Sequence, residues 1–406
     1  MSAKIKPRLI VISPFLDKRH GTERPVVEWI SRVTDDFDIH IYSQRVEDLD
    51  LSKITWHRIP ELPGPHLLNY IWWFAANHVW RSWDRLFRGI RPDLIFSPGV
   101  NCLDADLVSV YIVFAEYSRQ LADTLKFAGN PISRWPQLLH RRLYYGLIAF
   151  LERRIYRNPE TILLLIAQRT AAELKEHYGR QESCFVVYLG LDHQTFSPAR
   201  RSAARGKARN ELGYPDERFV ILLVGNHWVN KGLPVLLEAL QSLPDLPVDL
   251  LAVGRENPED YRAMVEEKGL QGRVRFVAPR NDVDFYYAAA DVYAGPSTRD
   301  TFALPPAEAL ACGLPVIVSS SNGTSEIIKH GVNGLILRDA TDATSLSRMI
   351  RQLCEDENFR AGIGANAAQT AREYTWERNA RELNAIVEET LHRKAKVTPP
   401  KLPQEL

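Results

Sequence analysis

The chain has 406 residues, of which 45% are hydrophobic and 25% are charged, and its net charge is +1. This length is enough for two or three domains of ordinary size, and the nearly balanced charge argues against a dedicated nucleic-acid-binding protein. The sequence contains no run of 18 apolar residues, so we expect no membrane-spanning helix.

The N-terminus and the cysteines indicate an intracellular protein. Residues 1–6 lead directly into an apolar run, which leaves no room for a signal peptide, so we expect a cytoplasmic location. The cysteines are isolated from one another and show no metal-ligand spacing, so we expect buried thiols and no bound metal; they are Cys102, Cys184, Cys312 and Cys354.

The first residues predict a strand, a glycine-bearing loop and a helix. Residues 8–13 form a β-type run, Gly21 lies in the loop, and Thr22 is a candidate N-cap. Apolar residues then recur at helical spacing, at Val26, Trp29, Ile30 and Val33. This order of elements is typical of the start of a Rossmann-like domain. Further strands are predicted at 39–43, 94–97, 107–114, 161–167 and 184–188.

A predicted helix at 70–91 carries Trp72, Trp73, Trp80 and Trp83. Such a row of tryptophans is compatible with sugar stacking or a membrane interface. Packing against a neighbouring helix is the more common role, and we favour it.

A second predicted helix, at 138–157, is amphipathic and basic. Between residues 134 and 157 the sequence has six arginines and a single acid, Glu152, which gives a local charge of +5. Such a helix can lie on an anionic bilayer at the inner face of the membrane, or it can be a solvated face of the scaffold. The sequence leaves both interpretations open.

The second half of the chain alternates strands and helices. Residues 199–210 are small, polar and basic, which is typical of a linker. Strands are predicted at 219–224, 248–253, 274–277, 292–294 and 316–319, which implies a parallel, doubly wound sheet. We therefore predict domains at 1–197 and 198–375, a last helix at 376–393 and a disordered tail at 394–406.

The unusual residues of the second domain fall after the carboxyl ends of its predicted strands, where open parallel sheets bind their ligands. They lie in the segments 225–232, 254–255, 279–280, 299–300 and 320–326. Lys231 offers a point charge for a diphosphate, and Gly232 lets the backbone approach it. Alternatively, Lys231 is a surface lysine that caps a helix, and the sequence would look the same.

Two carboxylates bracket a predicted helix start in the segment 295–319. Asp300 and Glu308 are separated by seven residues, and Pro305 and Pro306 occupy the first helical turn. A helix N-terminus favours an anion, and neighbouring carboxylates can accept hydrogen bonds from hydroxyl groups. The simplest ligand that combines an anion with a polyol is a sugar nucleotide.

The same segment resembles the donor-binding signature of the retaining glycosyltransferases of family 4. The signature is an acidic residue, seven others and a glutamate around a Phe-Gly-Leu-Pro core. In this chain Asp300 stands where glutamate is usual, and Ala303 stands where glycine is usual. The segments 190–198 and 20–23 also resemble the domain crossing and the Gly-Gly-x-Glu loop of that family.

The resemblance implies the GT-B fold, an α/β fold with two Rossmann-like domains facing across a cleft. It implies transfer of a sugar, with retention, from a UDP-, GDP- or similar nucleoside diphosphate sugar to a hydroxyl acceptor in glycan, glycolipid or polysaccharide synthesis. No metal or other cofactor is expected, and no protein nucleophile is evident. The last helix would cross back to the first domain.

The resemblance also assigns roles to individual residues. The catalytic candidates are Asp300 for the donor sugar hydroxyls, Lys231 for the phosphates and Glu308 for the ribose. The full donor-binding set is Gly21, Asn226, Lys231, Gly232, Arg280, Arg299, Asp300, Thr301, Phe302, Ala303, Leu304 and Glu308. The acceptor-side candidates are His20, Tyr111 and Glu116.

Two departures from the family pattern keep other functions open. Asn226 occupies a position where the family has a phosphate-binding arginine, and Arg299 is our preferred substitute. Tyr111 lies close to a position where a histidine often approaches the donor sugar. A non-catalytic sugar-nucleotide-binding or partner subunit therefore remains an alternative, as does an epimerase or phosphorylase of the same fold.

Overall fold

The computed structural model describes residues 6–19, 21–122, 125–127 and 131–397, and these divide into two compact units. The first unit runs to Tyr188 and also includes the last helix from Trp376, whereas the second unit spans Leu189–Thr375. The sequence places this boundary at 197/198.

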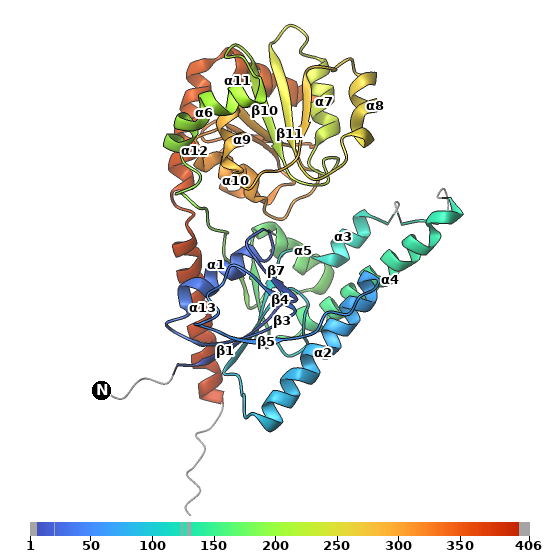
Figure 1. The fold of residues 1–406 in the computed structure, drawn as a ribbon, viewed down its shortest axis with the longest axis vertical. Helices are drawn as coiled ribbons and strands as arrows, with labels where there is room; N and C mark the ends of the chain where they lie inside the picture. The colour runs from blue at the N-terminus through green and yellow to red at the C-terminus, as the bar shows by residue number, and fades with distance from the viewer. Residues whose placement is uncertain (1–5, 20, 123–124, 128–130, 398–406) are drawn as a thin grey trace, which may run out of the picture. The chain divides into compact units, whose positions relative to one another are not determined.

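The first unit is built on a seven-stranded parallel sheet (Figure 1). The strands, in their order across the sheet, are β5 (Thr55–Arg58), β3 (Asp38–Ser43), β1 (Arg8–Ile12), β6 (Leu94–Pro98), β7 (Leu107–Val110), β8 (Ile162–Leu165) and β9 (Cys184–Val186). β1 pairs with β3 on one side and with β6 on the other, so the strand order reverses between β1 and β6. A short separate pair joins β2 (Phe15–Leu16) to β4 (Arg45–Val46).

Successive residues of each strand point to opposite faces of this sheet, and both faces are buried beneath helices. Leu9 and Val11 face a core that includes residues of α1 (Arg24–Val33) and α13 (Trp376–Val397). Ile10 and Ile12 face the core on the other side. That second core receives residues from α2 (His66–Phe87), α4 (Trp135–Tyr156) and α5 (Gln168–Tyr178). The short helices α3 (Phe114–Gln120) and η1 (Ile132–Arg134) complete the unit.

The second unit has a six-stranded parallel sheet. Its order is β12 (Val274–Val277), β11 (Val248–Val253), β10 (Phe219–Val224), β13 (Val292–Gly295), β14 (Val316–Ser319) and β15 (Leu335–Leu337). This is the strand order of a Rossmann fold, and it reverses between β10 and β13. The two predicted Rossmann-like domains are therefore confirmed, although the sequence analysis missed β2, β4, β5 and β15.

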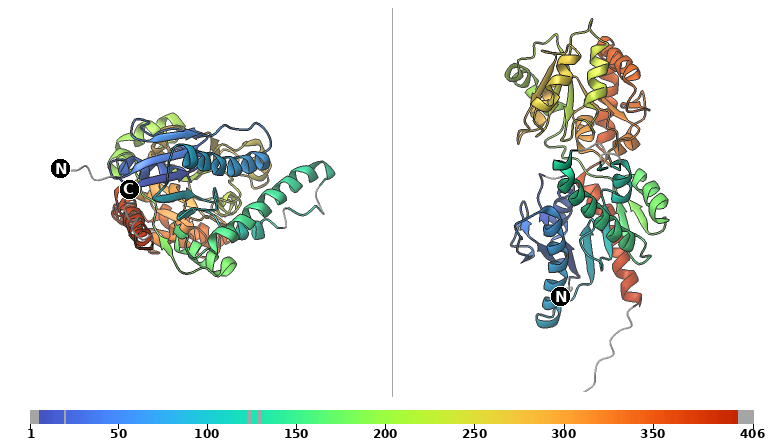
Figure 2. Two further views of the ribbon diagram at one scale, coloured as in Figure 1. Left: turned by 90° about the horizontal axis from the view of Figure 1, so that it is seen from below. Right: turned by 90° about the vertical axis from the view of Figure 1, so that its right-hand side faces the viewer.

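The helices of the second unit surround this sheet (Figure 2). They are α6 (Pro198–Leu212), α7 (Leu233–Gln241), α8 (Glu259–Glu267), α9 (Asp284–Ala289), α10 (Leu304–Ala311), η2 (Gly323–Ile327), α11 (Ala343–Glu355) and α12 (Glu357–Ala371). The predicted helix start at Pro305 and Pro306 is confirmed, because both prolines lie in the first turn of α10.

The prediction of a linker at 199–210 is wrong, because this segment lies within the helix α6. Pro198 begins the helix after the N-cap Ser197, and Gly213 ends it in a left-handed conformation. The basic residues make tertiary contacts: Arg205 and Arg209 both pair with Asp291, at 2.6 and 3.2 Å. The small and basic residues of α6 therefore pack this helix against α9 and the start of β13.

Other differences concern where elements end. The strand predicted at 107–114 stops at Val110, and α3 begins at Phe114. The N-cap of α1 is Glu23 rather than Thr22. α13 continues to Val397, so residues 394–397 belong to this helix, and the remainder of the predicted tail, 398–406, lies outside the described residues. None of the described helices has the length and apolar character needed to span a membrane.

Candidate functional site

The loops that follow β10 and β13 meet where the strand order of the second unit reverses. Asn230 joins them: its Nδ2 donates a hydrogen bond to the carbonyl oxygen of Arg299 (2.9 Å), and its own carbonyl accepts one from the amide of Thr298 (2.9 Å). Each loop therefore fixes the other at the position where open α/β sheets bind ligands.

These two loops bring Lys231 and Asp300 together. The Nζ of Lys231 forms an ion pair with the carboxylate of Asp300, and the two side chains are only 18% and 17% exposed. A Cβ added to Gly225 would lie 3.0 Å from Cε of Lys231, so the absence of a side chain there leaves room for the lysine. Two residues chosen from the sequence for one ligand are thus in direct contact.

Gly232 is a glycine for steric reasons. Its φ is +95°, and an added Cβ would lie 2.5 Å from the carbonyl oxygen of Pro296. A side chain at this position would therefore be strained and would also collide with backbone. Gly232 is the N-cap residue of α7, so it fixes where this helix begins beside Lys231.

The backbone of Asp300 is held by the loop that follows β14. Its amide donates to the carbonyl of Ser321 (3.1 Å), and its carbonyl accepts from the amide of Gly323 (3.0 Å). Three strand ends, those of β10, β13 and β14, therefore determine the position of this carboxylate.

Glu308 lies on α10 and is 6% exposed. Its Oε2 accepts a hydrogen bond from the hydroxyl of Tyr287 (2.9 Å). The N-cap residue of α10, Ala303, offers no side-chain cap, and Phe302 and Ala303 are both buried. Pro305 and Pro306 carry no N–H, so the first turn of α10 offers fewer amide donors than most, and a helix start without a side-chain cap favours an anion.

The other predicted donor residues have protein partners. The Oδ1 of Asn226 accepts a hydrogen bond from the amide of Arg255 (2.9 Å) and so connects the loops after β10 and β11. Arg280 pairs with Asp282 (2.8 Å) and Glu211 (3.2 Å). Arg299 is 9% exposed. Thr301 and Leu304 lie between Asp300 and Glu308 and are half-buried.

The described candidate ligand-binding residues of the first unit are not in contact with one another as Lys231 and Asp300 are. His20 lies outside the described residues. Gly21 is exposed, and a Cβ added there would meet nothing within 4 Å. Glu116 lies on α3 in an ion-pair network with Arg119 (2.6 Å) and His177 (2.9 Å). Although partial burial opposes it, hydrogen bonds from Arg119, His177 and Gln120 lower the pKa of Glu116 to about 2.

Glu116, Glu176 and His177 are also the group of described residues whose side chains are close enough to share a metal ion. The guanidinium of Arg119 already contacts both carboxylates, at 2.6 and 2.8 Å. This cluster is therefore well explained as an ion-pair network.

Tyr111 lines a pocket of about 460 Å³ where the strand order of the first unit reverses, and we call it the aromatic pocket. Its walls come from the loops after β1, β3, β5, β6 and β7 and from α2 and α4, with aromatic residues such as Tyr70, Trp73, Phe114, Tyr144 and Tyr156. Sequence reasoning missed this pocket because its residues come from many separate segments between Ser13 and Tyr156. The tryptophans of α2 were the one available signal.

Residues 204–370 match the family of glycosyl transferases group 1. This part of the chain is therefore similar to the group 1 glycosyl transferases. The match covers the second unit and contains Lys231, Asp300 and Glu308.

Two relatives illustrate how far the chain resembles curated proteins. It is 32% identical over 230 residues to the D-inositol 3-phosphate glycosyltransferase of Corynebacterium kroppenstedtii, which covers 53% of this chain and 51% of the relative. It is 30% identical over 242 residues to the protein of the same name from Corynebacterium glutamicum, which covers 57% of each chain. The chain thus spans about half the length of the curated relatives it matches.

Solved structures extend the similarity in fold to nearly the whole chain. WaaG, a glycosyltransferase involved in lipopolysaccharide biosynthesis, has a TM-score of 0.72 at 20% identity and covers 92% of this chain and 98% of its own. Anabaena HepE, in complex with UDP and glucose, has a TM-score of 0.70 at 19% identity and covers 94% of this chain and 99% of its own. Sucrose-phosphate synthase from Thermosynechococcus elongatus has a TM-score of 0.73 at 18% identity, with coverage of 96% and 100%. The predicted GT-B fold is confirmed.

Proposed function

We propose that the protein transfers a sugar from a nucleoside diphosphate sugar to a hydroxyl acceptor, with retention of configuration at the anomeric carbon. The observation that carries this proposal is the Lys231–Asp300 pair at the strand-order reversal of the second unit, next to the start of α10. The ammonium group of Lys231 and the carboxylate of Asp300 could each bind a different part of a ligand that has both phosphate and hydroxyl groups. Lys231 would hold the diphosphate, and Asp300 would accept hydrogen bonds from the sugar hydroxyls.

The remaining parts of the donor would bind along α10. The amides at its start, near Phe302 and Ala303, would hold the phosphates, and the carboxylate of Glu308 would accept the ribose hydroxyls. Tyr287 orients that carboxylate through its hydrogen bond. Charge on the leaving diphosphate would thus be balanced by protein groups, so this proposal needs no metal ion.

Retention would follow from reaction on one face of the sugar, with the leaving phosphate taking the acceptor proton. The structure of HepE contains UDP and glucose, which supports a uridine donor as the first to test. The relatives named D-inositol 3-phosphate glycosyltransferase act on a phosphorylated acceptor, which supports an acceptor that carries phosphate.

The donor assignment is tested with a panel of UDP-, GDP- and ADP-sugars. Wild type should bind one of them and release its nucleoside diphosphate when an acceptor is present. Glu308→Gln should weaken donor binding about tenfold in calorimetry, because a charge-assisted hydrogen bond is roughly twice as strong as a neutral one. Tyr287→Phe is the matched control: it keeps the carboxylate and should have a smaller effect. Equal donor affinity in wild type and Glu308→Gln would contradict the ribose assignment.

Turnover separates the enzyme from a sugar-nucleotide-binding subunit. Lys231→Ala should abolish release of the nucleoside diphosphate, whereas Lys329→Ala, at an exposed lysine of the same unit, should not. Binding of a donor by wild type without turnover for any acceptor would favour the binding subunit.

We also propose that α4 contacts an anionic membrane surface. Its outward face exposes Leu139, Leu143 and Phe150 by 50%, 55% and 62%, with Arg153 and Arg154 beside them. The one acid of the helix, Glu152, is fully buried, so every exposed charge of α4 is positive. An apolar stripe bordered by arginines is typical of helices that lie in a bilayer interface.

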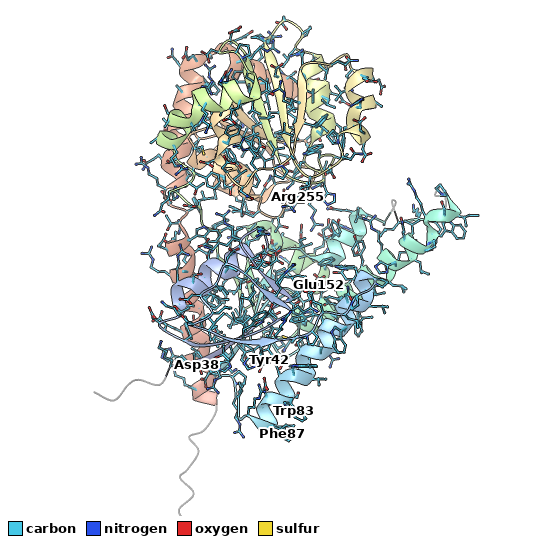
Figure 3. The ribbon with its side chains drawn as sticks, viewed as in Figure 1. Asp38, Tyr42, Trp83, Phe87, Glu152 and Arg255 are labelled. Carbon is cyan, nitrogen blue, oxygen red and sulfur yellow. The ribbon has the colours of Figure 1, made fainter. Side chains whose placement is uncertain are left out.

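α2 offers a second exposed apolar surface on the same unit. Trp73 is buried, as packing predicts, but Trp83 and Phe87 are 57% and 67% exposed at the end of the helix (Figure 3).

The protein should co-sediment with vesicles containing anionic lipid at low salt and should be released at high salt. Arg153→Glu with Arg154→Glu should abolish this binding.

The control is Arg262→Glu with Arg348→Glu, which makes the same change in net charge on exposed arginines of α8 and α11. Equal loss of binding in both double variants would indicate a general charge effect instead of a surface on α4.

A further inference from the structure

The aromatic pocket is lined partly by polar side chains, among them Glu23, Glu61 and Asn69, but the polar atoms along its aromatic wall have protein partners. The indole Nε1 of Trp73 donates to Oδ1 of Asn101 (3.1 Å), and the Nδ2 of Asn101 donates to the carbonyl of Pro98 (2.8 Å). The hydroxyl of Tyr70 donates to the carbonyl of Val100. A free sugar needs a hydrogen-bonding partner for most of its hydroxyl groups, and the aromatic wall leaves few, so this part of the pocket favours an apolar group.

α4 contributes to this pocket with the face opposite its exposed stripe. Tyr144, Ile148 and Tyr156 line the pocket, whereas Leu143 and Phe150 are exposed on the outer side. In Figures 1 and 2, the N-terminal half of α4 projects beyond the sheet of the first unit. One helix therefore has an apolar face on a ligand-sized pocket and another on the surface.

A second hollow adjoins the aromatic pocket, and we call it the basic hollow. It has a volume of about 730 Å³ and is lined by the N-terminal ends of α2 and α4, with Arg134, Arg141, His66 and His140 among its residues. None of the described residues that line it is acidic. His66 lines both cavities, so they are neighbours.

The charge of the basic hollow comes from its arginines. Burial lowers the pKa of His66, and the charge of His140 lowers it further. Two guanidinium groups with no acid among the described lining residues fit a phosphate, which arginine binds through paired hydrogen bonds.

We propose that these two cavities bind an amphipathic acceptor, with its hydrocarbon part in the aromatic pocket and its phosphate in the basic hollow. The proposal rests on the proposed function only in naming this ligand as the acceptor. All the residues that line the two cavities belong to the first unit, whereas Lys231, Asp300 and Glu308 belong to the second. A volume of about 460 Å³ is typical of pockets that enclose a small ligand.

The probes are n-octyl phosphate, inorganic phosphate and n-octanol, titrated separately into the full chain without donor. We expect n-octyl phosphate to bind at least tenfold more tightly than either of the others. Equal affinity for n-octyl phosphate and inorganic phosphate would overturn the role of the aromatic pocket. Equal affinity for n-octyl phosphate and n-octanol would overturn the role of the basic hollow.

Two substitutions on α4 test the aromatic pocket. Ile148→Phe adds volume to a residue that lines it, so the ring should enter the cavity, leave Tm nearly unchanged and reduce n-octyl phosphate binding at least tenfold. Leu151→Phe, one turn later in the packed core, should lower Tm because no cavity is available there. Retained binding by a folded Ile148→Phe variant would contradict the proposal.

The basic hollow is tested with Arg134→Gln and Arg141→Gln. Each should reduce the preference for n-octyl phosphate over n-octanol, whereas Arg153→Gln, farther along α4 and outside the hollow, should not. An equal effect of all three would show that net charge alone is responsible.

Donor binding in the same proteins separates the two proposals. Ile148→Phe should keep wild-type affinity for the sugar nucleotide, since Lys231, Asp300 and Glu308 lie in the other unit. If wild type binds n-octyl phosphate but no donor, the proposed transferase function fails while the amphipathic site stands. If wild type binds and turns over a donor but does not bind n-octyl phosphate, the amphipathic site fails while the proposed transferase function stands.

Discussion

At the scale of single residues, the structure shows which glycines have no room for a side chain, and the sequence alone does not. Gly232 has a positive φ, and a side chain there would meet the backbone of Pro296, whereas Gly21 has open space around it. Gly232→Ala should lower the free energy of unfolding by about 2–4 kcal/mol, since both strain and collision contribute. Gly21→Ala should change it by less than about 0.5 kcal/mol. Denaturant unfolding of both variants measures this, and a tolerated Gly232→Ala would contradict the geometry.

The sequence placed Lys231, Asp300 and Glu308 correctly at strand ends and helix starts, because periodicity and prolines determine those positions. It could not determine which side chains already have partners. Asn226 stands in the position of an expected arginine, but its carboxamide is bonded to the amide of Arg255. Arg280 is held by Asp282 and Glu211. Such partners come from distant loops, and residue type alone does not reveal them.

At the scale of elements, Glu152 connects three helices. Its carboxylate accepts hydrogen bonds from the amides of Phe114 and Ala115 at the start of α3 and from the hydroxyl of Tyr178 on α5 (2.8, 3.2 and 2.7 Å). Figure 3 labels its position on α4. Burial raises the pKa of Glu152 to about 7 despite these hydrogen bonds.

This raised pKa predicts a pH dependence of stability. A carboxyl group whose pKa is higher in the folded than in the unfolded state contributes stability below about pH 4.5 that is lost as the pH rises toward 7. One pKa unit is about 1.4 kcal/mol, so the loss over this interval is on the order of 3 kcal/mol. Glu152→Gln should remove it, which the difference between the unfolding free energies of wild type and variant measures from pH 4.5 to 7.

Glu116→Gln provides a control of opposite sign. The pKa of Glu116 is lowered to about 2, so its stabilising contribution is present above about pH 4.5 and is lost as the pH falls toward 2. A difference curve for Glu152→Gln that stays flat from pH 4.5 to 7 would show that this carboxyl group is not shifted.

Helices and strands with strong apolar periodicity were predicted well, and α6 shows why others were not. Its sequence has few large apolar residues, because arginines make its contacts with Asp291 and with backbone carbonyls. A helix held by buried guanidinium groups lacks the pattern by which helices are recognised. The edge strands β5 and β15 and the two-residue strands β2 and β4 were also missed.

At the scale of the whole molecule, the first unit is discontinuous in sequence. Ala380, Leu383 and Val387 of α13 belong to the core formed with Val26 and Trp29 of α1. The indole of Trp29 also donates to Oδ1 of Asn384 (2.8 Å). The strand order could be expected from the alternation of elements, but the association of this helix with the first unit came only from family resemblance.

This association predicts that α13 stabilises the first unit selectively. Val387→Asp places an unpaired carboxylate in a fully buried position and should destabilise the first unit by more than about 3 kcal/mol. Ala385→Asp, on the exposed side of the same helix, should have little effect. Calorimetric unfolding measures this, and donor binding should persist in both variants because the second unit is separate. Equal stability of the two variants would contradict the packing of α13.

The discontinuity of the first unit has a consequence for synthesis on the ribosome. The second unit has all of its residues once Thr375 has left the exit tunnel, but the first unit still lacks the helix that closes one face of its core. The apolar surface of α1 stays uncovered while the whole second unit is translated. The part of the chain that is made first is therefore the last to be completed, and chaperones that bind nascent chains would find their target there.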